Sequence, residues 1–335
     1  MKRKEGFFYP FLLLCNILLL GLQLLIMGAL GSFFSETVLP LFVLPLMCIN
    51  LLFFFYWLLR LKWPFFLFVV CVLVAYQEFQ LLYQFPNNVI QTEKGLKILT
   101  YNVRLFNKYG WKKENELAQK IETFIMQQNP DVICFQEFSQ ELSPTFKAYP
   151  YRYFMASNRK GNHGTCILSK RPFQQTGEIP FKDSKNNGVY VDLEWNNRLT
   201  RIYNIHFESF ALQQQDSLLS RANLLKFRKH LRQTINKQGD QIAQLNSLYK
   251  GMENPYIICT DLNNNAFSNT YALIKGDKKD AFIEAGEGLG TTYWFSFFPL
   301  RIDYIFTARA LRVLDFNTFS EIDFSDHKPI MATVK

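Results

Sequence analysis

The chain has 335 residues, enough for about two domains, and a formal net charge of +9 at pH 7. The basic excess fits a polyanionic or phosphorylated partner, although a solvated basic surface explains the same charge. None of the six cysteines forms a Cys-x-x-Cys pair. The sequence therefore offers neither a disulfide framework nor a common zinc motif.

Hydrophobic residues dominate the first 85 positions, where charged residues are few. Apolar runs long enough to cross a bilayer predict three transmembrane helices, at about residues 11–31, 38–59 and 64–85. The third run is cleanly apolar only through Tyr76, and a full span needs the mixed segment that follows. A cleavable signal peptide is the alternative for the first run, but two more apolar runs follow it at once. We therefore expect residues 1–88 to form a membrane anchor.

Basic residues beside these runs predict their orientation. Lys2, Arg3 and Lys4 precede the first run, and Arg60 and Lys62 follow the second. Because basic flanks stay on the cytoplasmic side, the N-terminus is expected in the cytoplasm and the chain beyond the third helix outside it. The expected protein is a multi-pass protein of the cell membrane with an extracytoplasmic main domain. If the third run does not span, the same rule places that domain in the cytoplasm.

We expect residues 95–335 to form the main domain, after a turn-rich linker. Runs typical of strands alternate with helical patterns, and the pairing signals are mostly antiparallel. This pattern predicts an α/β fold in which helices cover two β-sheets. The stretch 293–298 is rich in aromatic residues, and it fits either hairpin packing or an apolar, base-stacking lip beside a site.

Polar side chains stand where the predicted strands of this domain end. Glu137 follows a short apolar run, and a carboxylate there can bind a hard cation, with an ordinary surface glutamate as the alternative. Asp303 lies inside an apolar run, where a buried acid must be hydrogen-bonded or paired. Asp326 precedes His327 just before the last strand, and an aspartate can orient a histidine and raise its basicity. Further strand ends carry Asn102, Arg104, Asn204, His206, Asp261 and Asn263.

In this order the motifs resemble the endonuclease/exonuclease/phosphatase superfamily, over about residues 95–335. The matching motifs are Tyr101-Asn102-Val103-Arg104, Gln136-Glu137, Asn204-Ile205-His206, Thr260-Asp261-Leu262-Asn263, Arg301-Ile302-Asp303-Tyr304 and Ser325-Asp326-His327. The resemblance implies a deoxyribonuclease I-like fold, a four-layer α/β sandwich with two mostly antiparallel central β-sheets. It also implies hydrolysis of phosphoester bonds with a divalent metal, usually Mg²⁺, with Mn²⁺ or Ca²⁺ as alternatives.

The resemblance also assigns roles to the matching positions. Asp261 would orient or deprotonate the attacking water, and Asp303 would sit behind a catalytic histidine. Arg104 stands where some nucleases of the family carry an acid, so it cannot bind metal there and could hold substrate phosphate. The implied metal ligands are Glu137, Asn102 and Asp326, and the implied substrate contacts are Arg104 and Asn204. The implied catalytic residues are His206, Asp261, Asn263, Asp303, Asp326 and His327.

The predicted function is that of a membrane-anchored, divalent-metal-dependent phosphoesterase, with nuclease activity placed first. The alternatives are a phospholipid or sphingomyelin-type phosphodiesterase, an inositol-phosphate phosphatase, and a catalytically inactive tethered binding module. The basic stretch 221–232 favours nucleic acid, whereas the membrane anchor and the 293–298 aromatics favour a phospholipid head group. The retained Glu137, Asp261, Asp326 and His327 argue against lost activity. A lipid bilayer is the partner expected of the N-terminal helices.

Overall fold

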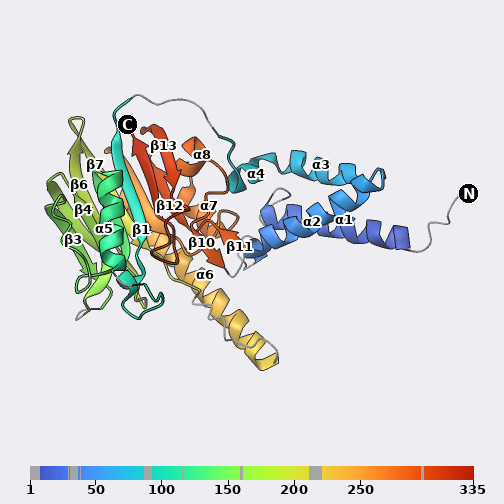
Figure 1. Cartoon of the computed structure of the whole chain (residues 1–335), viewed down its shortest axis with the longest axis horizontal. Coiled ribbons are helices and arrows are strands. Elements are labelled where there is room, and N and C mark those ends of the chain that lie inside the picture. The colour runs from blue at the N-terminus through green and yellow to red at the C-terminus, as the bar shows by residue number, and fades with distance from the viewer. Residues whose placement is uncertain are drawn as a thin grey trace, which may run out of the picture. The chain divides into compact units, whose positions relative to one another are not determined.

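The computed structural model describes residues 8–28, 30, 37, 39–86, 93–114, 116–158, 161–210, 221–295 and 298–335 (Figure 1). For residues 221–228 it describes the backbone alone. Contacts within the chain divide it into two units. One comprises residues 1–82 together with Asn265–Ala272, and the other comprises Tyr83–Asn264 and Leu273–Lys335.

The first unit is helical and strongly apolar. Its N-terminal helices are α1 (Phe8–Met27), η1 (Leu39–Phe42), α2 (Val43–Leu59), α3 (Phe65–Val74) and α4 (Tyr76–Leu82). The helix α1 and the continuous helix Leu39–Leu59 are each long and apolar enough to span a membrane. The single helix expected over residues 64–85 is instead two helices, α3 and α4, bent by 84° at a break next to Ala75. The α3 piece is apolar and α4 is mixed, with Gln77, Glu78 and Gln80, and neither is long enough by itself to cross a bilayer.

Polar side chains inside the helical unit are paired with one another. Asn50 donates to Gln23 Oε1 at 2.6 Å, and Trp57 Nε1 donates to Asn16 Oδ1 at 3.2 Å. Such pairs link α1 to α2 and satisfy one polar atom of each asparagine, which would be costly to leave bare among apolar helices. Asn16 Nδ2 and Asn50 Oδ1 have no partner in the described part of the chain. Phe267, from the segment that follows β8 in the chain, packs into the apolar cluster of this unit.

The second unit contains two six-stranded β-sheets. The first runs in the order β13 (Val313–Thr318), β14 (Ile330–Val334), β1 (Leu96–Asn102), β2 (Val132–Ser139), β4 (His163–Ser169) and β3 (Tyr151–Ala156). The second runs in the order β5 (Phe173–Pro180), β6 (Asn187–Trp195), β7 (Arg198–His206), β8 (Tyr256–Asp261), β12 (Asp303–Thr307) and β9 (Lys279–Asp280). Each sheet has one parallel pair, β1 with β2 and β7 with β8, and its other pairs are antiparallel. The remaining strands, β10 (Tyr293–Phe295) and β11 (Phe298–Leu300), form a separate hairpin.

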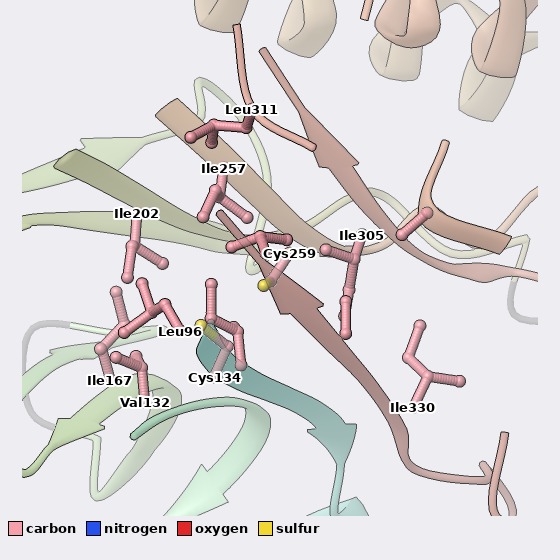
Figure 2. Close-up of a cluster of buried hydrophobic side chains, with 14 of the residues drawn as sticks. Leu96, Val132, Cys134, Ile167, Ile202, Ile257, Cys259, Ile305, Leu311 and Ile330 are labelled. Atoms are coloured by element: carbon pink, nitrogen blue, oxygen red, sulfur yellow. The ribbon is translucent and has the colours of Figure 1, made fainter. Parts of the chain in front are cut away.

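Alternation along the strands makes a core on each side of the first sheet. Ile98 and Cys134 face the second sheet and join the cluster that Figure 2 shows between the sheets. The neighbouring Leu99 and Ile133 point the other way, where they meet Ile121 of α5 (Leu117–Gln128). On the second sheet, α6 (Arg221–Tyr249) packs its C-terminal end against β7 (Figure 1). The short α8 (Ala281–Ala285) belongs to the same unit, whereas α7 (Asn269–Lys275) is divided between the two units. Two helix-covered sheets packed face to face confirm the predicted α/β sandwich.

Candidate active site

The parallel strand pairs bring distant polar residues to one edge of the sandwich. Asn102 ends β1 and Asp261 ends β8, one in each sheet. The Asn102 amide donates to Asp261 Oδ2 at 2.9 Å and to Glu137 Oε1 at 3.3 Å. The carboxyl ends of parallel strands therefore meet here across the interior, as strand-end sites do in open α/β sheets. Asn102 joins the two sheets where the candidate residues gather.

Two histidines flank the Asp261 carboxylate. His206 Nε2 lies 3.5 Å and His327 Nε2 lies 3.7 Å from Asp261 Oδ2. On its other side, the His327 ring places Nδ1 at 2.9 Å from Asp303 Oδ2. Asp303 stands opposite Asp261 in the antiparallel β8–β12 ladder. The arrangement is an Asp–His pair aimed at a second carboxylate, with another histidine beside it.

The Asp303–His327 pair holds a proton at neutral pH. Burial alone would lower the pKa of His327, but the Asp303 and Asp261 carboxylates raise it well above its ordinary value. Burial raises the pKa of Asp303, and the charge of His327 lowers it in part. Both directions describe one shared proton, which rests on the imidazole because histidine is intrinsically the stronger base. His327 is thus a charged donor held by Asp303.

Several site residues have left-handed backbone angles, which L-residues other than glycine rarely adopt. Glu137 has φ 48° at a bulge of β2, and Asn263 has φ 53° just after β8. Arg104, directly after the Asn102 strand end, has φ 43° and begins a left-handed run of four residues that ends at Asn107. Each such residue costs roughly 1–2 kcal/mol. Strain of this kind persists where the surroundings impose it, and it is typical of functional sites.

The left-handed run fixes Arg104 beside the site. Its backbone N–H donates to Asn102 Oδ1 at 3.0 Å. The guanidinium lies 4.3 Å over the Trp111 ring, and Nη1 lies 3.1 Å from Asp326 Oδ2. The Ser325 hydroxyl, one residue before Asp326, donates to the Asn102 carbonyl oxygen at 2.8 Å. The loops after β1 and before β14 are therefore tied together at this edge.

The donor set fits a hard divalent cation. Within the described part of the chain, the Glu137 carboxylate accepts a hydrogen bond from Asn102 and pairs with no basic side chain. A half-buried carboxylate with most of its acceptor positions unused matches the oxygen ligands that Mg²⁺ and Ca²⁺ take. Asn102 faces it with its N–H, and its Oδ1 accepts from the Arg104 N–H, which leaves that oxygen one lone pair for a ligand. Asp261, Asp303 and His327 also cluster closely enough to hold a metal. In that cluster, however, the His327 Nδ1 is already bonded to Asp303.

Asn204 corrects one expectation from the sequence. Its side chain is fully buried and donates to the carbonyl oxygens of Phe135 at 2.8 Å and Cys166 at 2.9 Å. Its own oxygen accepts from Gln136 Nε2 at 2.6 Å. These bonds run from β7 into the other sheet and use both polar atoms. Asn204 therefore joins the two sheets and has no atom left for the predicted substrate contact.

The structure also adds residues that the motifs did not indicate. Trp111 lies under Arg104, and nothing in its local sequence marks it. Thr292 Oγ1 accepts the backbone N–H of Asp303 at 3.1 Å and so helps to seat that acid. Tyr293 packs its ring 5.1 Å from the His327 ring. The aromatic richness of 293–298 was the one signal for Tyr293, because it allowed for a lip beside a site.

Comparison with known proteins gives the class. The model of the Endonuclease/Exonuclease/phosphatase family matches residues 99–327. The chain therefore belongs to this family. Members of the family are metal-dependent hydrolases of phosphoester bonds.

The curated relatives differ in substrate. A DNA-(apurinic or apyrimidinic site) endonuclease of Dictyostelium discoideum is 30% identical over 111 residues, which cover 31% of this chain and 28% of the relative. A Sphingomyelinase C of Leptospira interrogans is 32% identical over 163 residues, which cover 39% of this chain and 28% of the relative. The matched part thus spans about a quarter of each relative's length.

Similar solved structures share the fold. A humanized D. rerio TDP2 superimposes with a TM-score of 0.55 at 16% identity, over 72% of this chain and 100% of that one. The human Nocturnin catalytic domain gives 0.54 at 16% identity, over 72% and 93%. A Bacteroides thetaiotaomicron mannosyl-6-phosphatase gives 0.52 at 15% identity, over 72% and 99%. At these identities the likeness concerns the architecture and not the substrate.

Proposed function

We propose that this chain is a membrane-anchored, Mg²⁺-dependent phosphodiesterase that cleaves nucleic acid. The observation that carries the proposal is the placement of Asp261 between His206 and His327. The Asn102 amide donates to Asp261 and also to Glu137, so it links the two carboxylates. Phosphoryl transfer needs charge neutralisation and in-line placement more than covalent chemistry. A carboxylate base with the charged donor His327 beside it meets that need.

The side chains divide the work as follows. Asp261 accepts the proton of the attacking water, and His327, kept charged by Asp303, donates to a non-bridging phosphate oxygen. His206 assists departure of the leaving oxygen, and Asn263 holds the phosphate. Glu137 and Asn102 would hold Mg²⁺, which neutralises phosphate charge when bound.

Aromatic and cationic groups beside the site favour a nucleic-acid substrate. Trp111 is 47% exposed under the Arg104 guanidinium, and the exposed Tyr109 lies 5.2 Å from the Trp111 ring. Single strands bind where bases can stack on aromatic faces next to positive charge. Arg104 would contact the substrate phosphate from this platform.

A specific observation keeps a phospholipid head group as the second candidate. On the β10–β11 hairpin, Trp294 is 51% exposed and Phe295 is 42% exposed. Their neighbour Tyr293 packs against His327. Exposed aromatic side chains favour a membrane interface, and they stand here next to a catalytic candidate.

We propose that residues 1–88 anchor the enzyme and that residues 95–335 form its catalytic domain. The two long apolar helices support two crossings, and the bent α3–α4 pair would supply the third. With Lys2, Arg3 and Lys4 in the cytoplasm, three crossings place the catalytic domain outside it. The bend makes the third crossing the step on which this orientation depends.

The full chain in detergent, stripped of metal, provides the test. Mg²⁺ is added with bis-p-nitrophenyl phosphate, single-stranded DNA, RNA or vesicles that contain sphingomyelin, and product is measured. We expect hydrolysis of the first substrate and of nucleic acid, and its loss in His327→Ala. The matched control is His230→Ala, since His230 is an exposed histidine of α6. Cleavage of sphingomyelin without cleavage of nucleic acid would replace the first candidate by the second.

A further inference from the structure

Asp326 and Glu137 differ in how their charges are balanced. The Asp326 carboxylate is 30% exposed and has Arg104 Nη1 at 3.1 Å from its Oδ2. Its other oxygen, Oδ1, lies 3.2 Å from the Ser325 hydroxyl. Glu137, by contrast, pairs with no basic side chain in the described part of the chain. The fold thus supplies Arg104 as the cation beside Asp326. The negative charge of Glu137 is left for a bound metal ion to neutralise.

Arg104 is held in place from three directions. Its backbone is fixed by the bond to Asn102 and by the left-handed run, whose Leu105 and Phe106 are buried. Its guanidinium stacks on Trp111 and pairs with Asp326. The same run is closed at its far end, where the Asn107 side chain bonds both the N–H and the carbonyl of Lys112. A side chain anchored so fully is a permanent part of the site.

A second divalent ion at Asp326 would have to displace this guanidinium. An ion on the Asp326 carboxylate would lie within a few ångströms of the Arg104 charge, and like charges at that distance repel strongly in a half-buried site. Arginine also keeps its proton at any accessible pH, so its charge cannot be removed to make room.

We propose that Arg104 takes the place of a second metal ion, so that this centre binds a single divalent cation, at Glu137 and Asn102. The inference rests on the proposed function and refines it. It removes Asp326 from the metal ligands expected from the sequence and makes that residue the partner that orients Arg104. The positive charge on the Asp326 side of the phosphate then comes from the chain itself.

Counting bound Mn²⁺ tests the proposal without reference to hydrolysis. The metal-free full chain in detergent is titrated with Mn²⁺ while the free ion is followed by electron paramagnetic resonance. We expect one Mn²⁺ per wild-type chain, none in Glu137→Gln, and two in Arg104→Asp, because that substitution replaces the cation by a ligand next to Asp326. Arg104→Gln, which leaves Asp326 unpaired, is expected to show a weaker second site.

Lys112→Asp is the matched control. It makes the same charge change nearby, on a lysine that pairs with Asp323 and not with Asp326. One Mn²⁺ is expected there. Two Mn²⁺ in the wild type, or one in both Arg104 variants when circular dichroism shows them folded, would overturn the proposal. Failure of the proposed function is a separate outcome, in which the wild type hydrolyses no phosphodiester whatever its Mn²⁺ count.

Discussion

The buried Asp303–His327 pair allows a demanding test, the substitution Asp303→Asn. Asparagine keeps the size of the side chain and an oxygen that can accept from His327 Nδ1, whereas the negative charge is lost. In the wild type, the Asp303 and Asp261 carboxylates outweigh burial and raise the pKa of His327. Without the Asp303 charge the imidazolium is less stable, so the pKa of His327 falls and the ring is neutral over more of the working pH range.

The contact itself sets the size of the effect. A buried hydrogen bond of 2.9 Å between an imidazolium and a carboxylate contributes roughly 1.5–3 kcal/mol. The bond that the asparagine keeps with a neutral ring is about half as strong, so about 0.7–1.5 kcal/mol is lost. If that energy supports the charged donor in the transition state, its loss lowers kcat/KM by about 3- to 10-fold, at ~1.4 kcal/mol per tenfold. The larger end applies above neutral pH, where the variant's imidazole has lost its proton.

The assay is the pH profile of kcat/KM for bis-p-nitrophenyl phosphate with Mg²⁺. The wild type is expected to keep its activity above pH 6.5, the ordinary pKa of histidine, and the alkaline limb is expected to move to lower pH in Asp303→Asn. The free energy of unfolding is expected to depend on pH in the same direction as the activity. Because the folded pKa of His327 is raised, its contribution to the free energy of unfolding is complete below the unfolded pKa and disappears as pH rises through the folded one.

Asp192→Asn provides the control, because Asp192 is also buried but pairs with Arg201 in the second sheet, at 2.6 Å. It should lose stability and keep the wild-type alkaline limb. If Asp303→Asn keeps both the rate and the limb of the wild type, His327 is not the charged donor and the assignment of the pair is wrong.

Further predictions concern the interior, the metal, the hairpin and the membrane. Asn204→Ala should lower the free energy of unfolding by roughly 1–3 kcal/mol, because it leaves buried groups of the other sheet without partners. Thermal unfolding measures this loss, kinetics should show an unchanged kcat/KM, and the exposed Asn317→Ala is the control. Excess EDTA should abolish hydrolysis and Mg²⁺ should restore it, so activity that survives EDTA contradicts a metal-dependent reaction. Trp294→Ala should reduce hydrolysis of sphingomyelin vesicles but not of bis-p-nitrophenyl phosphate if the hairpin contacts membranes, and equal effects on both would contradict that role. A reporter fused after Lys335 should be active only outside the cytoplasm, and a cytoplasmic signal would mean that the α3–α4 pair does not cross.

The sequence alone was sufficient for the class of fold and for most residues that meet at the site. Asn102, Glu137 and Asp261 each end a short apolar run, and a strand with its polar end is a local pattern. The order of the motifs then fixed the family, which the match over residues 99–327 confirms. The long apolar runs of α1 and α2 were likewise visible from composition, because a bilayer span needs only length and hydrophobicity.

Other features depended on contacts between distant segments. Asn204 and His206 are two residues apart and point to the same side of β7, yet the former lies between the sheets and the latter at the edge near Asp261. Which of the two residues can meet a substrate depends on how far β7 extends past its neighbouring strands. The sequence of β7 alone does not show where that edge lies. The bend at Ala75 is similar, since an apolar run reads alike whether its helix is straight or broken.

Arg104 shows the difference most clearly. Its sequence position indicated only that an acid of some relatives was replaced by a base. The left-handed run, the Trp111 ring beneath the guanidinium and the ion pair with Asp326, 222 positions farther along the chain, exist only in the folded protein. Local propensity disfavours four consecutive left-handed residues, and the burial of Leu105 and Phe106 in the core overrides it. The sequence thus determined which chemical groups are present, and tertiary packing decided which charge each of them faces.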